Sequence, residues 1–400
     1  MKYVLILGDG MADRPIPELG GRTPLEYAKT PTMDDLAKES EIGLVKTIPD
    51  GMSPGSDTAN MSVCGYDPKI YYTGRSPLEA LSIGVAMKDT DVAIRTNVVT
   101  LSEDDLPYEQ KTILDHSSGE ISTEDAQVLI EAVQKELGGG MFHFYVGTSY
   151  RHLLIWDQGS VVPLTPPHDI LGKTVGDYLP KEPFLRKMQE RSYEILNNHP
   201  INVARRAAGL NPANSIWFWG AGTKPILTSF EEKTGKKGVM ISAVDLLKGI
   251  AVGAGMDIKI VEGANGGLHT NYEGKAQAAV DVLTKDDYDF VYIHLEAPDE
   301  MGHQGSVQKK VQSIEYLDGR VIGAVKKGLE DAGVDFRMLV MPDHPTPIWC
   351  RTHTSDPVPY MIYDSSKDMG AGLLYTEKEA ERSGIEEKEG YRLIEKLLQI

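Results

Sequence analysis

Residues 3–10 of the chain read YVLILGDG. A short apolar run that halts at Gly-Asp-Gly predicts a buried strand feeding a loop, and this strand delivers Asp9 at its carboxyl end. Ligands of α/β proteins usually bind at the carboxyl ends of strands. Asp9 is therefore the first candidate ligand residue.

Similar apolar runs recur along the chain. They are IGLVKTI from Ile42, MDIKIVEG from Met256, DFVYIHLE from Asp289, FRMLVMPD from Phe336 and PVPYMIY from Pro357. Apolar residues at helical spacing lie between them, most clearly in a helix from Val307 to Leu329 that closes at Gly333. Alternating strands and helices predict an α/β fold with a doubly wound, mostly parallel sheet.

The middle of the chain departs from this alternation. Segments such as FHFYVGTSYRHLLIW and SIWFWGAG are joined there by Pro-rich stretches such as LTPPHD. One helix is well marked, capped by Ser122 with Asp125 three residues on, and it ends before Gly138. We expect a core formed by residues 1–86 and 233–400, with an inserted α+β cap domain at 87–232.

The composition narrows the classes of function. There are 41 Lys and Arg against 59 Asp and Glu, and the net charge of −18 argues against a sequence-independent nucleic-acid surface and for a small-molecule enzyme. Cys64 and Cys350 are too few for a disulfide framework, which suits a reducing, cytoplasmic setting. No apolar stretch has the length of a membrane span, so no membrane association is expected.

Acidic and histidine side chains gather near the C-terminal end, in APDEMGHQG, VMPDHP and RTHTSDP. Asp299 and His303 are four residues apart, so on a helix both lie on one face and can bind one cation, which His353 can complete. Asp343 and His344 are neighbours, and the prolines on either side predict a loop in which both can bind metal. Such oxygen and imidazole donors suit one or two divalent cations.

The stretch PDGMSPGSDTANMSVCGYDP, residues 49–68, predicts a loop followed by a short helix from about Ser56. A serine at this position normally caps the helix. The position also suits a nucleophile aimed at an anion, because backbone N–H groups and the positive end of the helix lie behind it. Since the neighbouring sequence offers no histidine base, this serine needs the predicted cations to become an alkoxide.

Three arginines are candidate substrate-binding residues. Arg75, Arg95 and Arg151 lie in YTGRSP, AIRTNV and GTSYRHL, where a guanidinium fork can hold a carboxylate or phosphate. Each alone is more often a surface or hinge residue. GKTV at Gly172 is not a phosphate loop, since Pro167 occupies the position of its first glycine.

With these residues assembled, the chain resembles the cofactor-independent (2,3-bisphosphoglycerate-independent) phosphoglycerate mutases of the archaeal type, in the alkaline phosphatase superfamily. The resemblance covers essentially the full length, through LGDGMADRP, PGSDTANMSVCGYDP, PHDILGK, NPANSIWFWG, HLEAPDEMGHQG, MPDH and RTHTSDPVPY. It implies an alkaline-phosphatase-like core with two metal ions. One ion would be held by Asp299, His303 and His353, and the other by Asp9, Ser56, Asp343 and His344.

The resemblance also implies a reaction. Ser56 would take the phosphoryl group of 3-phosphoglycerate as a phosphoserine and return it to the 2-hydroxyl of glycerate, a step of glycolysis and gluconeogenesis, with no 2,3-bisphosphoglycerate. Mn²⁺ is the expected metal, with Mg²⁺, Co²⁺ and Zn²⁺ as alternatives. A sister group with similar LGDGMAD and TPLEYA openings, proposed to phosphorylate homoserine, is also similar. A metal-dependent phosphohydrolase and a metal-stabilised binding protein remain further alternatives, and no oligomeric state is predicted.

Overall fold

The computed structural model describes residues 1–400 and divides the chain into two compact units. Unit 1 comprises Met1–Tyr72 and Ile226–Ile400, and unit 2 comprises Thr73–Pro225. The inserted unit therefore begins at Thr73, whereas the sequence suggested 87, and ends at Pro225, whereas the sequence suggested 232.

Packing at the two joints explains these bounds. Helix α5 (Arg75–Ser82) contacts strands β3 and β7 of unit 2, so the insertion already includes it. At the other joint, the ring of Phe230 stacks on that of Phe290 in unit 1, with centroids 5.0 Å apart. The contacts of α5 and of Phe230 are tertiary, so the local sequence at the joints does not reveal them.

Unit 1 is built on an eight-stranded sheet with the order β13-β2-β12-β11-β1-β10-β8-β9. The strands are β1 (Lys2–Gly8), β2 (Glu41–Val45), β8 (Gly238–Ile241), β9 (Asp257–Ile258), β10 (Phe290–Leu295), β11 (Phe336–Met341), β12 (Val358–Asp364) and β13 (Glu386–Glu387). Neighbouring strands are parallel, except that β12 runs antiparallel to both β11 and β2. The predicted mostly parallel sheet is confirmed.

Two strands of this sheet differ from the sequence prediction. The run from Met256 forms only the two-residue β9, because it lies at the sheet edge with β8 as its single neighbour, and Ile260 just beyond it is 69% exposed. Strand β8 was missed, since the four residues of GVMI are too short to stand out from a helical pattern.

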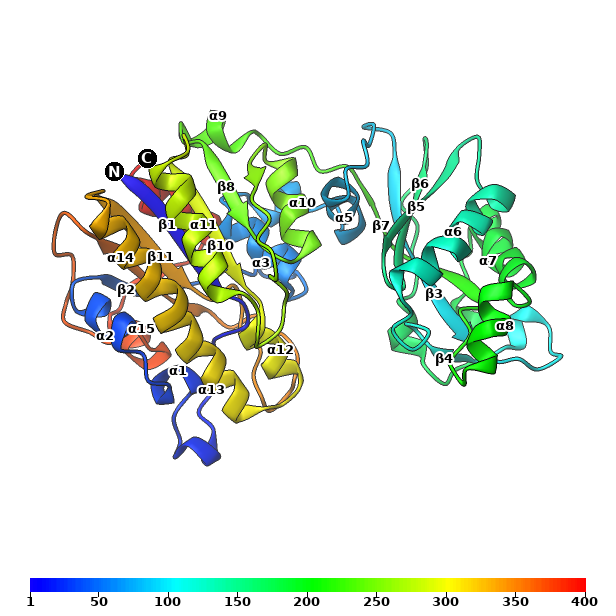
Figure 1. Cartoon of the computed structure of the whole chain (residues 1–400), viewed down its shortest axis with the longest axis horizontal. Coiled ribbons are helices and arrows are strands. Elements are labelled where there is room, and N and C mark those ends of the chain that lie inside the picture. The colour runs from blue at the N-terminus through cyan, green and yellow to red at the C-terminus, as the bar shows by residue number, and fades with distance from the viewer. The chain divides into compact units, whose positions relative to one another are not determined.

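Helices cover both faces of the sheet, as Figure 1 shows. Val4 and Ile6 of β1 point to one face of the sheet, where they belong to an apolar cluster with a first set of helices. Leu5, between them in the strand, is buried on the opposite face. The first set is α1 (Pro24–Tyr27), α2 (Pro31–Lys38), α11 (Tyr272–Thr284), α13 (Val307–Tyr316), α14 (Gly323–Asp331) and α15 (Glu377–Arg382). The second set includes α3 (Ser56–Val63), α10 (Asp245–Gly253) and α16 (Leu393–Leu398). The doubly wound prediction is therefore confirmed.

The predicted long helix from Val307 exists with an irregular middle. A π-helical segment, Leu317–Ile322, joins α13 to α14. Within it, the carboxylate of Asp318 accepts hydrogen bonds from the backbone N–H groups of Thr32 (3.2 Å) and Met33 (2.6 Å) at the start of α2. The wider turn thus ties α2 to the sheet-covering helices.

Unit 2 is an α+β structure in its own right. Its antiparallel five-stranded sheet has the order β4-β3-β6-β5, and β7 pairs with β3. The strands are β3 (Val92–Leu101), β4 (Ile113–Asp115), β5 (Phe142–Thr148), β6 (Arg151–Trp156) and β7 (Ser215–Thr223), and the long helices are α6 (Thr123–Leu137), α7 (Pro183–Leu196) and α8 (Pro200–Ala207). The Ser122 hydroxyl caps α6 as predicted, accepting from the Asp125 N–H at 3.2 Å.

No helix combines the length and apolar character that crossing a bilayer requires.

Candidate active site

The central strands of unit 1 bring the candidate ligands to one place. Strand β1 lies between β10 and β11 and is parallel to both, so the three carboxyl ends meet at one edge of the sheet. Asp9 follows β1, Asp299 lies on α12 (Ala297–His303) directly after β10, and Asp343 and His344 follow β11. The predicted helix at Asp299 and the predicted loop at Asp343 are both confirmed.

Asp9, Asp343 and His344 form one group of buried candidate ligands, with one donor atom of each within 4.8 Å of the others. Nε2 of His344 lies 3.4 Å from Oδ1 of Asp9 and 3.3 Å from Oδ2 of Asp343. The backbone N–H of Gly10 and the side-chain amide of Asn60 donate to Asp343 at 3.1 and 2.8 Å. These bonds hold the Asp343 carboxylate toward the group.

Asp299, His303 and His353 form the second group. Nε2 of His303 lies 3.2 Å from Oδ2 of Asp299 and 3.0 Å from Nε2 of His353. Nε2 of His353 lies 3.4 Å from Oδ1 of Asp299. Donor atoms of Asp299, His344 and His353 also lie within 4.8 Å of one another, so the two groups meet at His344.

Ser56 joins this cluster from α3. It is the first residue of the helix, and Gly55 occupies the N-cap position, so the serine hydroxyl does not serve as the cap. The Oγ atom lies instead 3.1 Å from Nε2 of His344. The fold thus brings every sequence-predicted ligand to one side-chain cluster.

The spacing of the donor atoms fits bound cations. In a tetrahedral site with metal–ligand bonds of about 2.0–2.1 Å, neighbouring donor atoms are about 3.3–3.4 Å apart. The contacts of His344 with Asp9 and Asp343, at 3.4 and 3.3 Å, have this length. Oδ1 of Asp9 is buried without a hydrogen-bond partner, which is costly unless a cation satisfies it. The residues present therefore fit divalent metal ions.

The pKa shifts in the cluster also indicate that its carboxylates need positive charge nearby. Burial, and then the neighbouring charge of Asp343, raises the pKa of Asp9 well above its ordinary value. Burial would raise the pKa of Asp299 as well, but hydrogen bonds with His303 and His353 outweigh it and lower this pKa well below the ordinary value. The hydrogen bond with Asp299 raises the pKa of His303 to about 9. In the metal-free protein, His303 supplies part of the positive charge that the carboxylates need.

Three residues of the cluster were not found from the sequence. Asn60 binds Asp343, Thr346 donates from its hydroxyl to Asp299, and Nε2 of His294 lies 2.8 Å from Oδ2 of Asp9. His294 is the polar residue of the otherwise apolar strand FVYIHL, and this interruption was the available signal. Asn60 lies one helical turn after the candidate nucleophile Ser56, and this spacing was a weaker signal in the sequence.

Unit 2 holds a separate basic cluster that contains the three predicted arginines. Arg75 and Arg95 both contact the carboxylate of Glu79, at 2.9 and 3.4 Å. The Cζ atom of Arg95 lies 4.6 Å from the centre of the Trp219 ring. Burial lowers the pKa of Arg95 to about 10, and the charges of Arg75 and Arg151 contribute to the lowering while Glu79 opposes it.

Two histidines extend this basic cluster. The ring of His168 lies 5.3 Å from that of Trp219 and 6.1 Å from that of His116. The ring of His116 also lies 5.8 Å from that of Tyr150, beside which Arg151 stands. Neither His116 nor His168 stands out as a candidate in the sequence, because only the fold of unit 2 places them near the arginines.

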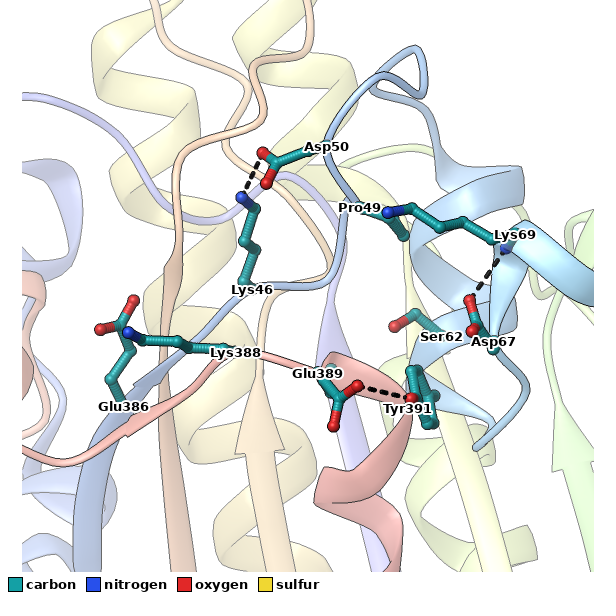
Figure 2. A pocket seen from close by; sticks show the side chains of 11 residues that line it. Lys46, Pro49, Asp50, Ser62, Asp67, Lys69, Glu386, Lys388, Glu389 and Tyr391 are labelled. Atoms are coloured by element: carbon teal, nitrogen blue, oxygen red, sulfur yellow. Dashed lines mark hydrogen bonds and ion pairs between the residues drawn. The ribbon is translucent and has the colours of Figure 1, made fainter.

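A surface cavity of about 380 Å³ lies elsewhere in unit 1, and Figure 2 shows its mixed charges. Its lining residues are Lys46, Pro49, Asp50, Ser62, Asp67, Lys69, Glu386, Lys388, Glu389, Gly390 and Tyr391. Lys46 pairs with Asp50, and Tyr391 donates to Glu389. None of the candidate ligands lines this cavity, so it is not part of the candidate active site.

Comparison with known proteins identifies the family. The 2,3-bisphosphoglycerate-independent phosphoglycerate mutase family matches residues 37–202. Such a mutase from Methanosarcina barkeri is 50% identical over 96% of both chains, and one from Methanothrix thermoacetophila is 44% identical over 100% of both. The structure of a cofactor-independent phosphoglycerate mutase from Thermoplasma acidophilum has a TM-score of 0.67 and 28% identity, covering 100% of this chain and 99% of that one. The chain therefore belongs to the archaeal type of 2,3-bisphosphoglycerate-independent phosphoglycerate mutases, which are isomerases.

Proposed function

We propose that this chain interconverts 3-phosphoglycerate and 2-phosphoglycerate through a phosphoserine on Ser56. The observation that carries the proposal is the position of Ser56 Oγ, at the start of α3 and 3.1 Å from a histidine of the buried donor cluster. A hydroxyl that does not cap its helix, next to donors suited to divalent cations, has the surroundings of an activated nucleophile.

We assign the metal-binding roles to the two groups described above. Asp299, His303 and His353 would hold one divalent ion, and Asp9, Ser56, Asp343 and His344 the other, with Mn²⁺ favoured over Mg²⁺, Co²⁺ and Zn²⁺. When bound, such ions lower the pKa of a coordinated hydroxyl and neutralise charge on phosphoryl oxygens.

The reaction then takes two phosphoryl transfers. In the first, Oγ of Ser56 loses its proton and bonds to phosphorus while the bond from phosphorus to O3 of glycerate breaks, and O3 gains a proton in exchange. In the second, O2 of glycerate loses its proton and bonds to phosphorus while the bond from phosphorus to Oγ of Ser56 breaks, and Oγ regains a proton. Backbone N–H groups at the start of α3 stabilise the negative phosphoryl oxygens in both steps.

We assign substrate binding to the basic cluster of unit 2. Arg75, Arg95 and Arg151 offer guanidinium groups to the carboxylate or phosphate of the substrate. Arg95 is held by Glu79 and the Trp219 ring, which orients its planar fork. Retaining glycerate between the two transfers keeps water from hydrolysing the phosphoserine and separates a mutase from a phosphohydrolase.

The test is an enolase-coupled assay of the full chain with 3-phosphoglycerate and Mn²⁺, without 2,3-bisphosphoglycerate. Turnover is expected, and its absence would overturn the proposal. Parallel incubations measure ADP formation from ATP with homoserine, and release of inorganic phosphate from 3-phosphoglycerate. ADP formation without mutase turnover would assign the chain to the homoserine-phosphorylating group, and phosphate release alone would assign it to the phosphohydrolases.

A further inference from the structure

His294 makes two directed contacts at the edge of the candidate metal cluster. It lies on β10 and is fully buried. Its Nε2 lies 2.8 Å from Oδ2 of Asp9, and its Nδ1 lies 3.2 Å from Oγ of Ser242. Both ring nitrogens therefore have a polar partner, unlike those of a histidine that merely fills space in a core.

The direction of each hydrogen bond follows from the partners. Asp9 must be ionised to serve as a metal ligand, and an ionised carboxylate can only accept, so in that state Nε2 of His294 carries the hydrogen and donates it. Nδ1 is then the acceptor and receives the hydroxyl hydrogen of Ser242, whose oxygen accepts from the backbone N–H of Val244 at 3.0 Å. A chain of donors thus runs from the backbone to Asp9 and fixes which histidine nitrogen is protonated.

The two oxygens of Asp9 have different surroundings as a result. Oδ2 accepts the hydrogen bond from His294. Oδ1 is buried without a hydrogen-bond partner and lies 3.4 Å from Nε2 of His344. Rotation of the carboxylate would break the contact with His294. The histidine therefore holds the unsatisfied oxygen toward the donor cluster.

The strand end that carries His294 is itself fixed. The ammonium group of Lys275, buried on α11, donates to the carbonyl oxygen of His294 at 2.8 Å. This bond ties the backbone of β10 to the covering helix where the strand ends. Hydrogen bonds thus hold His294 through both its ring and its backbone.

We propose that His294 is a positioning residue for the metal site built on Asp9, acting through the Asp9 carboxylate, with Ser242 fixing its tautomer. The inference rests on the proposed function, since it takes Asp9 as a metal ligand. Donors behind a coordinating carboxylate orient it and tune its affinity, and their loss typically weakens metal binding by about 10–100-fold. His294 itself would contact neither the metal nor the substrate.

The experiment compares two amides at position 294 in the metal-free full chain, by calorimetric titration with Mn²⁺. The amide nitrogen of glutamine reaches about as far as Nε2 of histidine, and that of asparagine about as far as Nδ1. His294→Asn should weaken Mn²⁺ binding at one site by about 10–100-fold while the site of Asp299, His303 and His353 keeps its affinity. His294→Gln should restore much of the loss, and His143→Asn, an exposed histidine of unit 2, should change neither site.

The outcomes separate this inference from the proposed function. A wild-type chain that binds no Mn²⁺ would overturn both. Two Mn²⁺ sites in the wild type with unchanged affinities in His294→Asn, or an equal loss in the asparagine and glutamine variants, would overturn the positioning role alone. If His294→Asn does not fold, Ser242→Ala decides, because a weakened single site supports the donor chain and two unchanged sites contradict it.

Discussion

Oγ of Ser56 lies 3.1 Å from Nε2 of His344, although the two residues are 288 positions apart in the chain. The sequence around Ser56 contains no histidine base, and the contact forms only because α3 and the loop after β11 meet at the same edge of the sheet. Ser56 begins α3 without capping it, so its hydroxyl does not stabilise the helix end. Its substitution should therefore affect chemistry more than stability.

The first prediction concerns Ser56→Ala. Mutase turnover should be lost, because no oxygen remains to accept the phosphoryl group. Binding of Mn²⁺ to Asp299, His303 and His353 should persist, since the hydroxyl is not among those donors. Coupled assays, trapping of labelled phosphoprotein and Mn²⁺ titration measure these quantities.

Ser53→Ala is the matched control for this substitution, since Ser53 is an exposed serine of the same loop. It should retain turnover and labelling. Activity in Ser56→Ala within a few-fold of the wild type would exclude the phosphoserine mechanism.

The second prediction concerns metal content. His303→Ala removes a donor whose Nε2 lies 3.0 Å from that of His353, so the protein should lose about one of two Mn²⁺ equivalents. Gln304→Ala, the exposed neighbour at the end of α12, should keep both. Elemental analysis after gel filtration measures the difference. Equal metal content in the two variants would remove His303 from the ligand set.

The third prediction is a pH dependence of metal affinity. The hydrogen bond with Asp299 raises the pKa of His303 to about 9 in the metal-free protein, whereas a ligand imidazole must be unprotonated. Below pH 9, a bound metal therefore displaces one proton from His303, and affinity should rise by up to about tenfold per pH unit from pH 7 to 9 and then flatten.

Calorimetry in buffers of different ionisation enthalpy counts the displaced protons. Release of about one proton per Mn²⁺ at the His303 site is expected at pH 7. An affinity that does not change between pH 7 and 9 would contradict the linkage between His303 and the metal.

The fourth prediction concerns the basic cluster of unit 2. Arg151 is exposed and lies beside the ring of Tyr150. Arg151→Ala should raise KM for 3-phosphoglycerate by about tenfold or more, the effect of losing one charge-assisted hydrogen bond. Arg186→Ala removes an exposed arginine of α7 that pairs with Glu190, and it should leave KM unchanged. Equal KM values in the two variants would remove Arg151 from the substrate site.

The strands that shape the candidate metal-binding cluster were predictable because each is a buried apolar run that ends at polar residues. Asp9, Asp343 and His344 all follow such runs, and the neighbouring prolines indicated the loop at the last two. The location of Asp299 and His303 on one face of a helix was predictable from their spacing of four residues. Local signals suffice where a ligand directly follows the element that positions it.

Residues that act through other residues were harder to find. Thr346 and Asn60 contact Asp299 and Asp343 only in the folded chain, and the position of Asn60 one helical turn after Ser56 does not identify Asp343 as its partner. The early bound of unit 2 was missed for the same reason, since α5 has an ordinary amphipathic pattern and its packing against β3 and β7 is a tertiary property. Short β8 and β9 carried too few residues for a periodic signal.

The fifth prediction concerns the stability of the loops that carry the candidate metal-binding cluster. Lys310 of α13 is fully buried, and its ammonium group contacts Asp13 at 2.9 Å and the carbonyl oxygen of Thr346 at 2.8 Å. The carboxylate of Asp13 also accepts from the backbone N–H of Ile348 at 3.2 Å. This ion pair therefore ties the loop after β1 to the loop after β11.

Lys310→Met should lower the free energy of unfolding by about 3–5 kcal/mol, because it leaves the Asp13 carboxylate buried without its cation. Lys309→Met, at the exposed neighbouring position, should change it by less than about 0.5 kcal/mol. Adding Asp13→Asn to Lys310→Met should recover part of the loss, since the remaining group is then uncharged. Urea unfolding of the metal-free variants measures all three values. A Lys310→Met variant as stable as Lys309→Met would show that the two loops are held together without this ion pair.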